Sequence, residues 1–491
     1  MRMDIDLESI QEARNFLEQA QQAQQIIGKM SQHDIDQIVH GMAQAALKES
    51  GRLASLAVEE TGYGKVEDKL TKNLFSARDI YESVKDKKTV GIISRDDTNK
   101  VWEVAEPVGV VAGIIPSTNP TSTAIFKAII AVKSRNAIVL SPHPAAAKCT
   151  KEAADILQQA AVQAGAPAGL ISCISKPTVA AANELMKHQV TKVILATGGS
   201  DMVKAAYSSG KPAYGVGPGN VPVFIHSSAN IQQAVKQIIR SKTFDYGTIC
   251  ASEQALVVEK SIKRKVKQEL ENQGAYFLDD YEKKRIEGII LINGRLNPKI
   301  VGQSPQKLAE LAGIAITDDC KLLVAEENNI GKAYPLSLEK LSPILAFYVA
   351  DNWQEASATC AQLLELGGLG HTAGIHCQDE AMIESFALEQ QASRVVVNSG
   401  TTFGGIGATT GIQPSMTLGC GSYGNNISSD NISVEHLLNI KRVAYGIREM
   451  EEAPAVPSYQ QVANVVASNG PNISRDEIMD IVKTVLQELK L

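Results

Sequence analysis

The chain has 491 residues, 44% hydrophobic and 21% charged, which is typical of a globular protein with two or three domains. A net charge of −6 and an aromatic content of 5% argue against nucleic acid or an anionic membrane as the main partner. The sequence shows no signal peptide and no apolar run long enough to cross a bilayer, so we expect a cytoplasmic protein.

Seven cysteines are spread over the sequence without a CxxC pair. Their odd count and spacing argue against a disulfide framework and against a zinc site, and we expect no bound metal. Free thiols fit a reducing compartment, and all but Cys250 are interpreted as buried apolar residues. These six are Cys149, Cys173, Cys320, Cys360, Cys377 and Cys420.

The predicted elements begin with helices. Apolar residues recur at helical spacing through residues 5–60, and Gly62 and Gly64 end this run. Residues 100–116 start with alternating polarity and end in a continuous apolar run, which predicts an exposed strand followed by a buried one.

From there strands and helices alternate in two successive stretches, the second starting near residue 228. The strands of the first are "VGVVAGIIP", "NAIVLSP", "LISCIS", "KVILATGG" and "VPVFIH". Those of the second are "ALVVE" (255–259), "GIILIN" (288–293), "KLLVAE" (321–326), "ILAFYVA" (344–350), "TAGIHC" (372–377) and "RVVVN" (394–398). The alternation predicts βαβ units, mostly parallel sheets and an α/β fold with two domains in series.

The C-terminal residues differ from the rest of the chain. Residues 450–472 are rich in Pro, Ser and Asn and predict a linker. Residues 473–491 predict a helix that begins with a capping box of Ser474 and Glu477. Its apolar residues fall on one stripe, formed by Ile478, Ile481, Val482, Val485, Leu486 and Leu489.

Glycine-rich loops occur at 215–220, 367–374 and 400–411. None has the dinucleotide-binding pattern G-x-G-x-x-G, and each alone is interpreted as a tight turn. "LATGGSDMVKAA" is a better candidate for an anionic cofactor, because two glycines join a strand to the start of a helix whose backbone N–H groups can bind it.

Four longer segments resemble the CoA-acylating branch of the aldehyde dehydrogenase superfamily. They span 114–148, 196–225, 241–258 and 338–348, and the resemblance covers roughly residues 10–448. It is strongest to the aldehyde half of bifunctional aldehyde/alcohol dehydrogenases and to acylating enzymes of bacterial microcompartments.

The resemblance implies three structural parts. A Rossmann-like cofactor-binding domain without the usual fingerprint is expected over 1–227, and an α/β catalytic domain over 228–430. A small β-arm, from 95–108 and 431–449, is expected to exchange between the subunits of a homodimer or a dimer of dimers.

The resemblance also implies catalytic roles. Cys250, in "FDYGTICASEQ", matches the nucleophile whose thiolate adds to an aldehyde carbon. Because no histidine is near it in sequence, we expect its surroundings to lower its pKa. Asn119, in "PSTNP", matches the residue whose NH2 group joins the backbone N–H of Cys250 in holding the oxyanion. The alternative for an asparagine before proline is a turn.

For NAD, the resemblance places Thr197, Gly198 and Gly199 against the dinucleotide and Glu339 on the nicotinamide ribose. His143, in "SPHP", is expected in the cofactor groove, although a plain turn is the alternative. The other residues expected to line the groove are Ser117, Thr118, Ser141, Pro144 and Pro343.

Hydrolytic aldehyde dehydrogenases carry a general-base glutamate that this sequence lacks. The matching stretch reads "GVGPGNVP", with Val216 near the expected position. A thiol needs less activation than water because its pKa is closer to neutral, so we expect coenzyme A to receive the acyl group. The expected reaction converts a short aldehyde, NAD+ and CoA reversibly to acyl-CoA and NADH. Glu253 as a base is an alternative to a structural role.

The tail resembles the encapsulation peptides of bacterial microcompartment cargo, which implies shell proteins as partners. A helix that packs on its own subunit is the alternative. Two rival functions stay open, a hydrolytic aldehyde dehydrogenase and a non-catalytic cargo or scaffold protein. The missing glutamate argues against the first, and the presence of Cys250 and Asn119 argues against the second.

Overall fold

A computed structural model describes residues 4–450, 460 and 474–488. The described residues within Met1–Ser94 and Trp102–Arg442 form one compact unit, and those within Arg95–Val101 and Val443–Leu491 belong to a second. None of the helices in these described ranges has the length and apolar composition needed to cross a bilayer. The same ranges contain no cluster of His, Cys, Asp and Glu side chains that could hold a metal ion.

The first sheet of the large unit has five parallel strands in the order β5-β4-β3-β6-β7. Their bounds are β3 (Val110–Ile115), β4 (Ala137–Pro142), β5 (Ile171–Cys173), β6 (Thr191–Thr197) and β7 (Ala213–Val216). Strand order reverses between β3 and β6, and doubly wound sheets bind ligands outside the carboxyl ends of strands at such a point.

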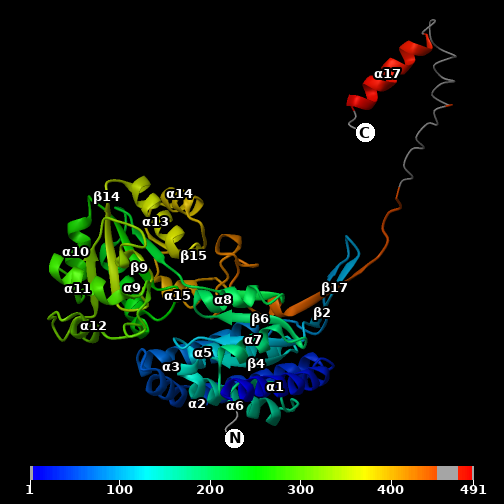
Figure 1. Cartoon of the computed structure of the whole chain (residues 1–491), viewed down its shortest axis with the longest axis horizontal. Coiled ribbons are helices and arrows are strands. Elements are labelled where there is room, and N and C mark those ends of the chain that lie inside the picture. Colours follow the sequence, from blue (N-terminus) through cyan, green and yellow to red (C-terminus); the bar gives the residue numbers. More distant parts are fainter. Residues whose placement is uncertain (1–3, 451–459, 461–473, 489–491) are drawn as a thin grey trace. The chain divides into compact units, whose positions relative to one another are not determined.

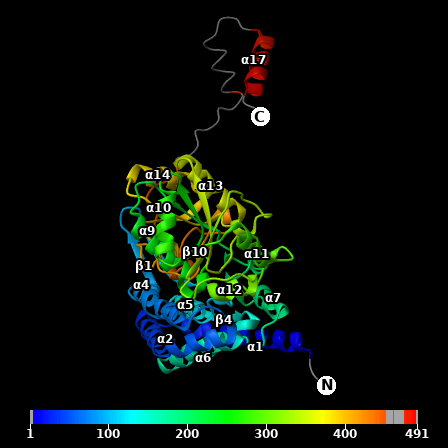
Figure 2. The ribbon, with the colours of Figure 1, turned by 90° about the vertical axis from the view of Figure 1, so that its left-hand side faces the viewer.

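Helices enclose this sheet. They are α1 (Ile5–Ile27), α2 (Gln32–Thr61), α3 (Val66–Leu74), a π-helical turn η1 (Phe75–Asp79), α4 (Ile80–Val84), α5 (Pro120–Lys133), η2 (Pro144–Ala146), α6 (Ala147–Gln163), α7 (Val179–Lys187) and α8 (Ser200–Tyr207). α5 and α6 pack on the sheet and are covered by α2, while α1 and α7 contact each other and the strands. In Figures 1 and 2, α1, α2 and α6 (blue to teal) lie together, away from α13 (Trp353–Gly367) and α14 (Glu380–Glu389).

Local chemistry explains where these helices begin and end. A capping box of Ser31 and Asp34 starts α2, and Gly62, in the left-handed conformation with φ 69°, ends it as predicted. α5 is buried on all sides, and between Ala124 and Val132 only Lys127 interrupts its apolar sequence.

The second sheet has seven strands in the order β10-β13-β14-β9-β8-β15-β16, all paired in parallel. The strands are β8 (Val221–Ile225), β9 (Glu253–Glu259), β10 (Ala275–Phe277), β13 (Leu322–Glu326), β14 (Ile344–Ala350), β15 (Gly370–His376) and β16 (Ala392–Val397). Its helices are α9 (Ile231–Thr243), η3 (Phe244–Gly247), α10 (Lys263–Asn272), α11 (Asp280–Ile290), α12 (Pro305–Ala312), η4 (Pro335–Ser337), α13 (Trp353–Gly367), α14 (Glu380–Glu389) and α15 (Thr401–Gly405).

Two details differ from the sequence-based expectations. Residues 288–293, predicted as a strand, mostly complete α11, because a capping box of Asp279 and Glu282 starts this helix and Ile286 and Ile290 form its buried face. The strand "VPVFIH", expected to end the first stretch, forms β8 and pairs with β9 and β15 of the second sheet. The chain therefore passes from the first sheet to the second between Val216 and Val221. The limits proposed for the domains stay predictions.

A small sheet has the order β1-β2-β17, with β1 (Gly91–Asp96), β2 (Val101–Pro107) and β17 (Leu438–Ala444). β2 and β17 lie in the segments predicted as an exchanging arm, whereas β1 begins at Gly91, ahead of them, and the exchange itself stays a prediction. The remaining short elements are β11 (Leu291–Ile292), β12 (Arg295–Leu296), η5 (Ser422–Gly424) and η6 (Val434–Leu437).

The tail contains α17 (Arg475–Glu488), inside the predicted 473–491 helix. Ser474 and Glu477 form the predicted reciprocal cap, since the Ser474 N–H donates to Glu477 Oε2 at 2.9 Å and Ser474 Oγ accepts from the Glu477 N–H at 3.4 Å. Ile481, Val482 and Val485 of the predicted apolar stripe are exposed. The predicted linker, 450–472, lies outside the described residues apart from 450 and 460.

Candidate active site

A cleft of about 420 Å³ lies where the carboxyl edge of the first sheet meets the amino edge of the second. Its walls come from the ends of β3, β6 and β7, and from the segments that precede β9 and β14. The lining residues are Tyr63, Pro116, Ser117, Thr118, Asn119, His143, Thr197, Gly198, Gly199, Val216, Gly217, Pro218, Thr248, Cys250, Leu296, Pro298, Val301, Glu339 and Leu341. The cleft therefore brings together nine of the twelve predicted catalytic and cofactor-binding residues.

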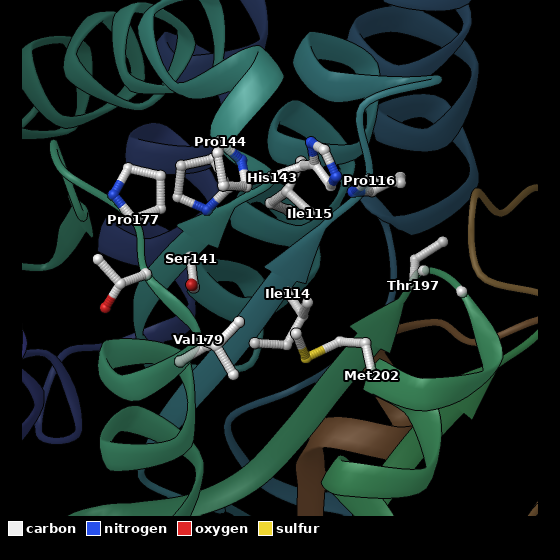
Figure 3. Close-up of a pocket in the computed structure, with 15 residues that line it drawn as sticks. Ile114, Ile115, Pro116, Ser141, His143, Pro144, Pro177, Val179, Thr197 and Met202 are labelled. Atoms are coloured by element: carbon white, nitrogen blue, oxygen red, sulfur yellow. The ribbon is translucent and has the colours of Figure 1, made fainter. Parts of the chain in front are cut away.

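An apolar slot opens from this cleft between β3, β4 and β6. Figure 3 shows Ile114, Val179 and Met202 converging on it from β3, α7 and α8. Ser141, His143 and Pro144 line the slot, whereas Pro343 lines neither the slot nor the cleft and is buried at the start of β14. His143 also caps the turn that follows it, because its Nδ1 accepts from the N–H of Ala145 at 3.1 Å.

The slot and the cleft fit a dinucleotide. Flat apolar walls suit an adenine ring, and the first turn of α8 has no side-chain cap, so its backbone N–H groups and positive end are available to an anionic diphosphate. A Cβ added at Gly199 would meet no atom within 4 Å, which shows open space at the mouth of this helix.

Cys250 lies in the bend between η3 and β9, and its side chain is partly exposed to the cleft. Its Sγ is 3.3 Å from Nε2 of His371, at the start of β15. Burial raises the pKa of the Cys250 thiol to about 12, and the Glu339 carboxylate adds to this rise. The expectation of a lowered pKa is therefore wrong: the surroundings are desolvated, and a nearby histidine is supplied by the fold rather than by the local sequence.

His371 belongs to a hydrogen-bonded chain that is fully buried on its far side. Its Nδ1 is 3.0 Å from Thr372 Oγ1, to which Arg394 Nε donates at 3.4 Å. Burial, helped by the Arg394 charge, lowers the pKa of His371 to about 3, so the ring is neutral near pH 7. From the sequence, residues 367–374 are interpreted as a tight turn. The one feature that could have indicated a catalytic role for His371 is its position directly before a predicted strand.

Glu339 is the one carboxylate among the described residues that line the cleft. Its Oε1 accepts from the N–H of Gly219 at 2.8 Å, and burial raises its pKa to about 7. Gly219 has no room for a side chain, since a Cβ there would lie 2.4 Å from the Cys250 carbonyl oxygen and 3.1 Å from the His371 ring. The loop 217–220 is thus packed directly against the nucleophile.

No carboxylate occupies the place at which a water-activating base was expected. Val216, at the end of β7, lines the cleft there with 3% of its surface exposed. Glu253, the alternative base, is buried at the start of β9, where its Oε1 accepts from the N–H of Thr401 at 2.8 Å. Glu253 does not line the cleft, so its position is that of a structural residue.

Comparisons with known proteins agree with this geometry. The sequence pattern of the aldehyde dehydrogenase family matches residues 3–276, more than half of the chain. Aldehyde-alcohol dehydrogenase 2 of Entamoeba histolytica is 48% identical over 84% of this chain and 49% of its own length. The chain thus spans about half the length of the curated relatives it matches first.

Solved structures match over nearly their whole length. An acetylating aldehyde dehydrogenase from Geobacillus thermoglucosidasius is 67% identical, with a TM-score of 0.91 over 92% of this chain and 100% of that one. A propionaldehyde dehydrogenase from the Clostridium phytofermentans fucose utilisation bacterial microcompartment is 27% identical, with a TM-score of 0.80 over 88% of this chain and 97% of its own. A propionaldehyde dehydrogenase of Rhodopseudomonas palustris, 26% identical with a TM-score of 0.80 over 88% of this chain and 97% of that chain, was solved with bound CoA and an acylated cysteine.

The chain therefore belongs to the aldehyde dehydrogenase family. The family suggested by the four sequence segments and the aldehyde dehydrogenase-like α/β fold are both confirmed. The roles of the individual residues stay predictions.

Proposed function

We propose that this protein is a CoA-acylating aldehyde dehydrogenase. It converts a short aldehyde, NAD+ and CoA to acyl-CoA, NADH and a proton, and the reaction is reversible. Acetaldehyde and propionaldehyde are the proposed substrates, and NAD+ rather than NADP+ is the proposed oxidant.

The observation that carries this proposal is the set of ionisable groups around Cys250. The thiol faces a cleft whose single described carboxylate, Glu339, is engaged with the N–H of Gly219 at 2.8 Å, and an apolar Val216 stands where hydrolytic relatives need a base. Because Glu339 is assigned to the nicotinamide ribose, water has no carboxylate left to deprotonate it, whereas a thiol is acidic enough to react with little help.

In the first half of the reaction, Cys250 attacks the aldehyde carbon. When the His371 ring carries its hydrogen on Nδ1, bonded to Thr372, Nε2 is free to take the thiol proton at 3.3 Å as the C–S bond forms. The negative charge that develops on the aldehyde oxygen offsets the low resting pKa of the ring. The new oxyanion accepts from the Asn119 carboxamide and the Cys250 backbone N–H. NAD+, when bound, would supply the oxidant for the thiohemiacetal carbon. His371 then loses its proton to solvent.

In the second half, the thioester on Cys250 meets CoA. The thiol of CoA gives its proton to His371 Nε2 as its sulfur attacks the thioester carbon, and Asn119 again holds the oxyanion. Cys250 leaves and takes that proton back, so the resting thiol is restored. The high pKa of Cys250 favours this final protonation, because a thiol that holds its proton tightly does not remain a reactive thiolate.

The similarity to acetylating and CoA-bound relatives supports this function over its rivals. A hydrolytic enzyme would need a base near Val216, and a scaffold protein would have no use for a buried His371 beside a partly exposed cysteine. The nicotinamide site is proposed at Thr197, Gly198, Gly199 and Glu339, with the adenosine in the slot of Figure 3.

The test is steady-state NADH formation from a panel of aldehydes with and without CoA, using NAD+ and NADP+. The proposal expects turnover with acetaldehyde or propionaldehyde only when CoA is present, and no turnover in the Cys250→Ala variant. Sustained turnover without CoA would contradict it.

We further propose that the protein assembles as a homodimer or dimer of dimers and serves as microcompartment cargo, with α17 contacting shell proteins. The similar propionaldehyde dehydrogenase from a microcompartment supports the cargo role. The apolar stripe to which Ile481, Val482 and Val485 belong gives α17 one apolar side, and this supports a helix that docks on a partner.

A further inference from the structure

A buried cluster of three charged residues lies directly behind Asn119. Lys69 and Lys72 come from α3, and Asp245 comes from η3, five residues before Cys250. Their side chains are 3%, 2% and 0% exposed. Both ammonium groups pair with Asp245 Oδ2, the one from Lys69 at 3.0 Å.

Lys72 connects this cluster to the cleft. Its Nζ donates to Asn119 Oδ1 at 2.6 Å and to Thr248 Oγ1 at 2.9 Å, besides Asp245. An ammonium group has only donors, so the Asn119 carboxamide must turn its oxygen toward Lys72 and its NH2 group away. One N–H of that group reaches Thr118 Oγ1 at 3.1 Å, which leaves the other for the cleft that Asn119 lines.

Burial of this cluster carries a free-energy cost for folding. Burial lowers the pKa of Lys72 to about 8 despite the Asp245 carboxylate. Asp245 and Tyr246 adopt the left-handed region, with φ of 49° and 51°, and Gly64 packs so closely that a Cβ there would lie 1.8 Å from Asp245 Oδ1. Buried ion pairs are seldom a net source of stability, and strained backbone gathers at functional sites.

We propose that Lys72 is a positioning residue for the oxyanion site: it fixes the orientation of the Asn119 carboxamide and places a positive charge behind it. Asp245 holds Lys72 in place and ties it to the loop that carries Cys250. This inference rests on the oxyanion role given to Asn119 in the proposed function. Lys72 acts on both halves of the reaction, because each passes through an oxyanion on the same carbon.

A double-mutant cycle tests the inference. Asn119→Ala is expected to lower kcat/KM for CoA-dependent acetaldehyde oxidation by about 10²- to 10³-fold, the usual loss for one oxyanion donor. Lys72→Met is expected to lower it by a similar factor in the wild-type background, yet by less than about threefold in the Asn119→Ala background. Alkylation of Cys250 by iodoacetamide, which forms no oxyanion, should keep its rate within about threefold in each variant.

Matched variants separate positioning from folding. Lys69→Met removes a buried charge from the same helix and the same Asp245 pair, but Lys69 contacts the Thr118 carbonyl and not Asn119, so its loss of kcat/KM should be at least about tenfold smaller. Lys72→Gln keeps a donor to Asn119 but removes the charge, so its kcat/KM should lie between those of Lys72→Met and wild type. It also replaces Lys72→Met in the test if that variant does not fold.

The outcomes are distinct. If Lys72→Met, or Lys72→Gln in its place, lowers kcat/KM by the same factor with and without Asn119, or slows alkylation equally, the inference is overturned. If Asn119→Ala retains full activity, the oxyanion role in the proposed function fails first.

Discussion

The two walls of the cleft are built in different ways. The first-sheet wall consists of small residues at strand ends, such as Gly198 and Gly199 after β6, and it follows the general rule for ligand sites in parallel sheets. The second-sheet wall carries Cys250 and Glu339 at the amino edge, with His371 buried behind Cys250, and no such rule applies there. Binding geometry therefore follows from local motifs, while the chemistry depends on contacts between distant segments.

Among changes to the second-sheet wall, replacement of Cys250 should lower the activity most. Cys250→Ala is expected to lower CoA-dependent NADH formation by at least about 10⁴-fold, since the nucleophile is lost while the fold is kept. The measurement is absorbance of NADH, with thermal unfolding as a check on the fold. Cys360→Ala, which removes a fully buried thiol from the core of the second sheet, is the control and should retain the wild-type rate. Equal losses in both variants would contradict the assignment.

The next largest effect is expected at His371. His371→Ala should reduce the rate by about 10²- to 10³-fold, because neither thiol has a base to accept its proton. Since burial holds the His371 pKa near 3, lowering the pH through the ordinary histidine range near 6.5 should not protonate it, and the wild-type rate at saturating NAD+ should show no inflection there. A wild-type rate that falls with an apparent pKa near 6.5, absent in the variant, would show that the ring titrates normally.

A change at Glu339 tests the proposed role of this residue in binding the cofactor. Glu339→Gln should raise KM for NAD+ by about tenfold, the usual value of hydrogen bonds to a charged acceptor, with a smaller change in kcat. Burial places the Glu339 pKa at about 7, so raising the pH from 6 to 8 ionises it and should lower KM for NAD+ in the wild type only. An unchanged KM for NAD+ in the Glu339→Gln variant would show that Glu339 does not bind the nicotinamide ribose.

These contrasts show what the sequence could predict. The helix starts, the parallel strands and the strand-end residues Asn119 and Thr197 follow from local patterns or from family motifs. Lys72 and His371 do not, because a lysine in "VEDKLTKNL" predicts an exposed face and a histidine among glycines predicts a turn. Only the packing of α3 under α5, and of β15 beside β8, brings them to Asn119 and Cys250. The raised pKa of Cys250 likewise comes from burial that no local pattern reports.

Removal of the C-terminal tail should have the smallest effect on the activity. Deletion of 458–491 is expected to leave kcat and KM within about twofold, since α17 supplies no residue that lines the cleft. The truncated protein should no longer co-assemble with microcompartment shell proteins, which co-sedimentation measures. Among point variants, Val485→Glu should disrupt co-assembly, and Lys483→Glu, off the predicted apolar stripe, should not. Loss of folding or of activity on deletion would instead indicate that the helix packs on its own subunit.

The most direct test of the central claim is a rapid-mixing experiment with acetaldehyde and NAD+ in the absence of CoA. The account predicts a burst of NADH stoichiometric with active sites, an acetyl group on the Cys250 peptide by mass spectrometry, and resumed turnover when CoA is added. Continuous NADH formation with release of free acetate, and no acetyl group on Cys250, would contradict it.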